Sequence, residues 1–148
     1  MTNIEITNMI LEFFISRGIK TRIRVNNERK DETHYAPVIQ IDVDFKGQLS
    51  EQFAFFYFVD DSIINFSVIY KMKQPLDGSK FRELADSIRG QIAPFEEFVK
   101  TDDDAYLFEL FREMKTADFS GGLLEELLNL FTEKDGVIEK LRSMSDGF

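Results

Sequence analysis

Residues 52–70 read QFAFFYFVDDSIINFSVIY, and this stretch decides the fold. Two apolar runs, 52–59 and 62–70, flank the polar dipeptide Asp60-Asp61. Short apolar runs bounded by turn-forming residues are typical of β-strands, and two polar residues between them indicate a tight hairpin. We therefore expect the two runs to pair as neighbouring antiparallel strands.

The register of this hairpin follows if Asp60 and Asp61 are its two loop residues, because loop length sets which residues lie opposite one another. One face then carries apolar pairs throughout, and we expect it to seal the core. The opposite face keeps large apolar groups only near the turn. The pairs expected on the core face are Phe53 with Val68, Phe55 with Phe66, and Tyr57 with Ile64.

The large apolar groups on the opposite face are Phe56, Phe58 and Ile63, and they form the candidate partner-binding patch. One interpretation is that a helix covers this second face, as happens for central strands that are apolar on both sides. The other is that the patch is left for a partner protein or a second subunit, since exposed aromatic clusters are costly unless they are used.

The chain upstream of the hairpin predicts a helix and two strands. Thr2 and Glu5 have capping-box spacing, and apolar residues then recur at helical intervals until Gly18. From residue 21 the period changes to two, which predicts a strand with one buried face over 21–26 and another over 37–45. The apolar positions of these strands are Ile23 and Val25, then Ile39, Ile41, Val43 and Phe45.

Downstream, residues 79–92 have helical spacing, and Pro94 ends that segment. Residues 95–114 fit two structures: a helix through Leu107, Leu110 and Met114, or a hairpin of 95–100 with 106–111. The hairpin is the preferred interpretation. A stripe of leucines then predicts a long C-terminal helix from 123 to about 144, which Gly136 could bend.

These elements predict one α+β domain over residues 1–148, with an antiparallel sheet packed against N-terminal, middle and C-terminal helices. Their order is α-β-β-β-β-α-β-β-α. Neither an internal repeat nor a Pro-rich linker divides the chain.

Composition narrows the function. The net charge is −9, from 27 acidic and 18 basic residues, which disfavours binding to nucleic acid or to anionic lipid. The chain has no cysteine, which excludes disulfides and thiolate chemistry and fits a reducing compartment. No basic leader or long apolar run is seen, so we expect a cytoplasmic protein without a membrane span.

Catalytic and metal-binding patterns are weak. His34 is the single histidine and lies in a charged loop, where a solvated surface role is more common than general-base catalysis. The acidic clusters Asp60-Asp61 and 102–104 lack the ligand spacing of an EF-hand and fit solvated turns. Phosphate-binding and nucleophile motifs are absent from the sequence. We expect no cofactor and no enzymatic activity.

The element order, size and acidity of the chain resemble the fold shared by type III secretion chaperones and the YbjN-like putative sensory transduction regulators. The resemblance covers nearly the whole chain, although four strands are predicted before the second helix where that pattern usually has three. It implies a homodimer that clamps an extended segment of a partner protein without ATP or a cofactor.

The sequence therefore predicts a non-enzymatic protein-binding domain, chaperone-like or regulatory, acting as a homodimer through apolar sheet or helix surface. The alternative is an acidic inhibitor that presents carboxylates in place of phosphates to a basic nucleic-acid-binding partner. The two differ in salt dependence, because only the alternative predicts binding that weakens steeply with salt. An enzyme with an unfamiliar carboxylate site is a third possibility.

Overall fold

The computed structural model describes residues 1–29, 35–45, 52–73, 78–102 and 105–145. These residues form helices and strands in the predicted order, with two short 3₁₀ helices added. The elements are α1 (Asn3–Ile15), β1 (Lys20–Arg29), β2 (Tyr35–Asp44), β3 (Gln52–Phe58), β4 (Ile63–Lys73), α2 (Gly78–Ile88), η1 (Arg89–Gln91), β5 (Glu96–Asp102), β6 (Ala105–Lys115), η2 (Thr116–Asp118) and α3 (Gly121–Ser145).

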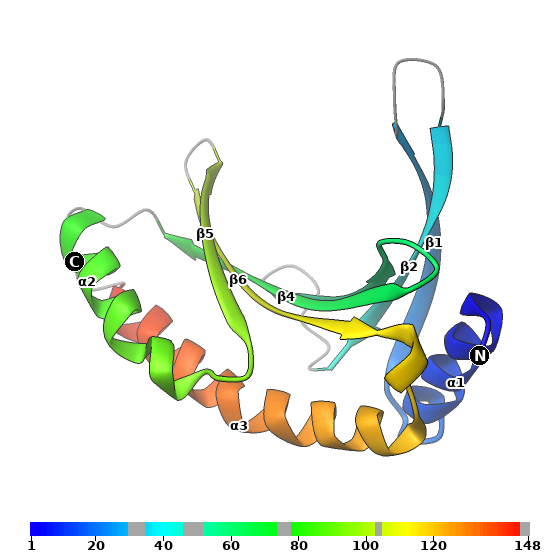
Figure 1. Cartoon of the computed structure of the whole chain (residues 1–148). Coiled ribbons are helices and arrows are strands. Elements are labelled where there is room, and N and C mark those ends of the chain that lie inside the picture. The colour runs from blue at the N-terminus through cyan, green and yellow to red at the C-terminus, as the bar shows by residue number, and fades with distance from the viewer. Residues whose placement is uncertain (30–34, 46–51, 74–77, 103–104, 146–148) are drawn as a thin grey trace.

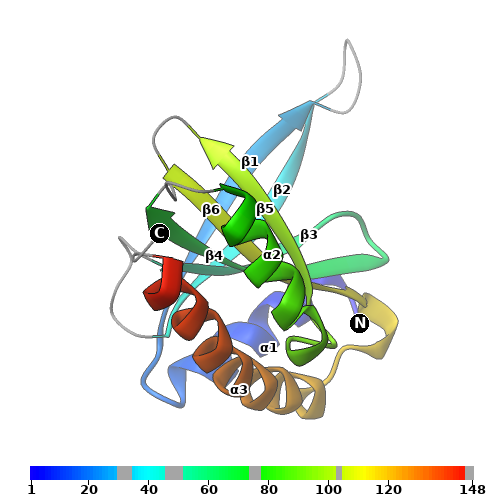
Figure 2. The same cartoon turned by 90° about the vertical axis from the view of Figure 1, so that its left-hand side faces the viewer.

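The strands form a six-stranded antiparallel sheet in the order β1-β2-β3-β4-β6-β5. The predicted α+β class is therefore confirmed, and so is the hairpin in the segment that also had helical spacing, as β5 and β6. α1, α2 and α3 all lie on one side of the sheet (Figures 1 and 2). The sheet curves strongly, so that β1 and β2 rise at one end and β5 at the other, around a concave face that points away from the helices (Figure 1).

Local sequence signals set the helix ends. At the start of α1, the Thr2 hydroxyl accepts a hydrogen bond from the Glu5 amide, and the Glu5 carboxylate accepts one from the Thr2 amide. This capping box satisfies two amides that the first helical turn leaves unpaired. After α1, Gly18 adopts a positive φ of 72°, a conformation that side chains disfavour, and the chain turns into β1. α3 continues as one helix through Gly136.

The core lies between the convex face of the sheet and the helices. Phe56 on β3 and Phe66 on β4 are directly opposite each other, with ring centroids 4.9 Å apart. Phe131 of α3 packs edge-on against Phe66 at 5.9 Å. α1 contributes Ile6, Ile10 and Phe14 to this core, and α2 contributes Phe81, Ala85 and Ile88.

The expected register of the β3–β4 hairpin is wrong by one residue. Phe56 pairs with Phe66 and Phe58 with Ile64, so the even-numbered residues of β3 face the core. Because side chains alternate between the two faces, a shift of one residue moves every side chain of β3 to the other side of the sheet. Phe55 and Tyr57, which were expected in the core, therefore lie on the concave face.

The turn explains this shift. The Val59 amide donates to the Ile63 carbonyl at 3.0 Å, so three residues rather than two form the loop between them. The Asp60 carboxylate holds this loop, because its Oδ1 accepts from the amides of Ser62 at 2.7 Å and Ile63 at 2.9 Å. Aspartate commonly organises turns by accepting from the backbone two residues on.

The first strand also differs from expectation. Ile23 and Val25 point to the helix side of the sheet as predicted, where Ile23 is paired with the buried Ile41. β1 is however the last strand of the sheet, and these two side chains are 47% and 63% exposed. The predicted buried face of β1 is therefore wrong at these two positions.

Candidate functional site

The concave side of the sheet is the candidate functional surface, and we call it the open face. No helix of the described residues covers it (Figure 1). Its centre is formed by side chains of β3, β4 and β6 that point away from the core. The apolar members, all half-buried, are Phe55, Tyr57, Ile63, Ile69, Leu107 and Phe111.

Only one residue of the predicted patch lies on this surface. Ile63 is on the open face, half-buried at the start of β4. Phe56 and Phe58 are 0% and 4% exposed in the core, because the three-residue turn reverses the facing of β3. Of the two interpretations of Phe56, Phe58 and Ile63, the one in which helices cover the face holds for Phe56 and Phe58, so these two residues do not form an exposed patch with Ile63.

The middle of the open face is an aromatic floor. Ser67 of β4 lies directly between Phe55 of β3 and Phe111 of β6, and it is 1% exposed. Because neighbouring strands are about 4.8 Å apart, the two large side chains flank and cover this small residue and form one apolar surface across β4. The ring of Tyr57 lies 6.1 Å from that of Phe55 and lengthens the apolar strip along β3.

A polar group interrupts this apolar strip. Asn65 lies opposite Tyr57 and donates a 3.0 Å hydrogen bond from Nδ2 to the Tyr57 hydroxyl. The Asn65 Oδ1 atom is buried and accepts no hydrogen bond in the described part of the chain.

Charged side chains border the open face on β1 and β2. Asp42 accepts from Arg24 Nε at 2.8 Å, from Arg22 at 3.1 Å, and from the amide of Gln40 at 2.9 Å. The Asp42 side chain is only 13% exposed, so two guanidinium groups and an amide satisfy most of its hydrogen-bonding capacity. Next to this network a pocket of about 210 Å³ is lined by Lys20, Thr21, Arg22, Asp42 and Asp44.

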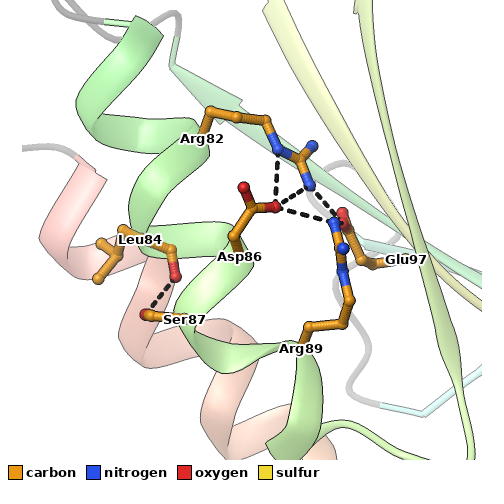
Figure 3. Close-up of polar contacts among 6 residues, drawn as sticks. All are labelled: Arg82, Leu84, Asp86, Ser87, Arg89 and Glu97. Atoms are coloured by element: carbon orange, nitrogen blue, oxygen red, sulfur yellow. Dashed lines mark hydrogen bonds and ion pairs between the residues drawn. The ribbon is translucent and has the colours of Figure 1, made fainter.

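At the other end of the sheet, an ion cluster joins α2 to β5 (Figure 3). The Glu97 side chain is 5% exposed, and its Oε1 accepts from both Arg82 and Arg89. Both arginines also bind Asp86, at 2.6 and 2.8 Å. The hydrogen bond from Arg82 lowers the pKa of the Asp86 carboxyl below its ordinary range, and the same bond raises the pKa of Arg82.

This cluster is better suited to holding α2 on the sheet than to chemistry. Its two cationic and two anionic side chains neutralise one another. The Glu97 Oε1 atom binds both arginines, while Oε2 is buried and accepts no hydrogen bond among the described residues. A second groove, of about 510 Å³, lies between α2 and α3. Its walls mix apolar and charged residues: Leu84, Ser87, Ile88, Gln91, Glu133, Gly136, Val137, Lys140 and Leu141.

The residues weighed for catalysis and metal binding lie partly within and partly outside the described chain. Asp60 is engaged in the β3–β4 turn, and Asp61 accepts a long 3.4 Å hydrogen bond from Asn3. His34, Asp103 and Asp104 lie outside the described residues. Among the residues described, no three His, Cys, Asp or Glu side chains come together in a way that could hold a metal ion. None of the described helices is long and apolar enough to cross a membrane.

Comparison with known proteins gives the fold alone. The sequence matches no family model and no curated protein. A crystal structure of an uncharacterised protein from Methanothermobacter thermautotrophicus has a similar fold, with a TM-score of 0.53 at 13% sequence identity. The alignment covers 95% of this chain and 99% of that one. At this identity the similarity supports the arrangement of elements and gives no information about function.

Proposed function

We propose that this chain is a non-enzymatic protein-binding domain, chaperone-like or regulatory, whose open face binds an apolar segment of a partner protein. The observation that carries the proposal is the aromatic floor around Ser67, which the helices leave uncovered (Figure 1). Contiguous apolar surface with a charged border is typical of protein-binding surfaces.

The features beside the floor fit this role. Phe55, Tyr57 and Phe111 are rigid aromatic groups, the kind of residue that contributes most at interfaces. The pocket beside Asp42 has room for one side chain of the bound segment.

The structure has four strands before α2, where type III secretion chaperones and YbjN-like regulators usually have three, so the resemblance rests on the size, the acidity and the rest of the element order. Binding of an extended partner segment without ATP or a cofactor is the kind of role that this resemblance implies. We include that role in the proposal.

Selection from a displayed library of random linear peptides tests the proposal. We expect enrichment of peptides with aromatic or aliphatic side chains. Their affinity should fall about tenfold or more in the double variant Phe55→Ser, Phe111→Ser, since loss of each buried ring removes more than about 1.4 kcal/mol of binding free energy. Val59→Ser is the matched control, because Val59 is an exposed apolar residue in the β3–β4 turn.

Two outcomes would overturn the proposal. One is the absence of enrichment over a blank support. The other is a set of peptides that bind the Phe55/Phe111 double variant as tightly as the wild type. If the enriched peptides were basic and their binding weakened steeply with salt, the acidic-inhibitor alternative would replace it.

A further inference from the structure

Exposed apolar side chains gather at one end of the molecule. Of the six large apolar side chains that are exposed among the described residues, all but Val59 belong to the first 25 residues. They lie at the N-terminus, on α1 and on β1, and α1 contacts β1. The five are Met1, Ile4, Ile15, Ile23 and Val25.

β1 is also an open edge. The sheet ends at this strand, so its outer backbone groups have no strand partner among the described residues. At 10 residues it is long for an edge strand, and a long edge with apolar side chains is a template for pairing with another strand. β5, at the opposite edge, has 7 residues, and α2 is anchored to it through Glu97.

The charges on β1 do not block this edge. Edge strands are commonly protected by cationic side chains that extend into solvent. Here Arg22 and Arg24 reach back across β2 and bind Asp42, so their guanidinium groups point away from the outer edge. Together with Lys20 and Asp44, these residues of β1 and β2 carry three positive and two negative charges, so this part of the sheet is nearly neutral in a chain whose net charge is −9.

From these observations we infer that β1 pairs with β1 of a second copy of this chain, in an antiparallel arrangement about a twofold axis. Two chains of net charge −9 repel each other, and they repel least through a surface whose local charge is close to zero.

The sequence of β1 selects one register. Directly opposed residues of antiparallel strands point to the same face, so odd-numbered residues must pair with odd-numbered residues. An axis at Arg24 places Ile23 opposite Val25 of the second copy, and Val25 opposite Ile23. Four exposed apolar side chains then form one cluster on the helix side of the joined sheets.

Neighbouring registers fit less well. An axis at Ile23 places Arg22 opposite Arg24 of the second copy twice, and like charges directly opposed destabilise a sheet. An axis at Val25 places Ile23 opposite the polar Asn27. With the axis at Arg24, that arginine meets its own copy once, and each guanidinium is already bound to Asp42.

Sedimentation of the intact chain is the first test. We expect a dimer in the wild type and a folded monomer in the double variant Ile23→Glu, Val25→Glu, because both side chains are exposed and their loss should not disturb the core. Val59→Glu changes an exposed apolar residue elsewhere and should remain a dimer. A wild-type monomer, or a dimer that the β1 substitutions leave unchanged, would overturn the inference.

Disulfide formation tests the register. Because the chain has no native cysteine, any disulfide must come from the introduced residue. In Arg24→Cys, the two Cα atoms would lie about 4.5–5.5 Å apart, within the range that a disulfide spans. In Lys20→Cys they would lie eight residues apart along the strand, roughly 27 Å. We expect rapid crosslinking of the first variant only. Equal rates for both variants would contradict the Arg24-centred register.

The inference is separable from the proposed function. Peptide binding to the open face can be measured on the Ile23→Glu, Val25→Glu variant, whose substitutions lie on the opposite side of the sheet. Retained peptide binding with a lost dimer supports both. A monomeric wild type that still binds peptides would overturn the dimer alone.

Discussion

The Tyr70 hydroxyl donates a 2.7 Å hydrogen bond to Oδ1 of Asp135 inside the core. Tyr70 is 0% exposed on β4, and Asp135 is 8% exposed near the middle of α3. This bond joins a central strand to the longest of the described helices inside the core. A buried polar pair of this kind fixes the position of one element on another, because displacement would leave polar groups unsatisfied.

Tyr70→Phe should lower the free energy of unfolding by about 1–3 kcal/mol, because it removes a buried donor and keeps the ring. Urea unfolding followed by circular dichroism measures the change. Tyr57→Phe is the matched control: its hydroxyl bonds to Asn65 on the half-exposed open face, so a loss below about 1 kcal/mol is expected. Equal losses in the two variants would argue against a special role for the Tyr70–Asp135 bond.

Most of the fold could be predicted from local sequence patterns. The capping box of Thr2 and Glu5, the period-two alternation of β2 and the helical spacing of α3 each specify an element without tertiary information. The sequence of β5 and β6 fits both the helical period and the two-residue period of a strand. Their hairpin is settled by pairing of β6 with β4, a contact between distant segments that periodicity does not record.

The candidate site could not be predicted as well, because it depends on a single turn. β3 is apolar on both faces, so hydrophobicity does not say whether Phe55 or Phe56 faces the core. The relevant signal is the spacing of Asp60 and Ser62, which favours an aspartate-organised turn of three residues. Exposure of Ile23 and Val25 depends on how far α1 extends over the sheet edge, which their own strand does not encode.

Alanine substitutions on adjacent residues of β3 test the observed facing. Phe56→Ala should cost about 3–5 kcal/mol of stability, as expected for a large side chain removed from a packed core. Phe55→Ala should cost about 1 kcal/mol, because the half-buried ring has no helix above it. Denaturant midpoints report both values. A larger loss of stability in Phe55→Ala than in Phe56→Ala would contradict the observed facing and favour the two-residue turn expected from the sequence.

The turn itself can be tested through its carboxylate. Asp60→Ala removes the acceptor for the Ser62 and Ile63 amides and should destabilise the chain by about 1 kcal/mol. Asp61→Ala should cost less than about 0.5 kcal/mol, since the hydrogen bond that this carboxylate accepts within the described part of the chain is a long one from Asn3. Thermal unfolding of the two variants gives the comparison. A larger effect at Asp61 would count against the proposed role of Asp60.

The α2–β5 ion cluster predicts a pH dependence of stability. Arg82 lowers the pKa of Asp86 in the folded chain, so the unfolded chain takes up the proton more readily. The stabilisation is complete above the unfolded pKa of about 3.9 and is lost as the pH falls through the lower, folded pKa. The stability difference between wild type and Asp86→Asn should therefore be largest near neutral pH and shrink in acid. Glu83→Gln, on the same helix without an ion pair among the described residues, should keep the wild-type profile. A difference that grew in acid would show the opposite sign of coupling.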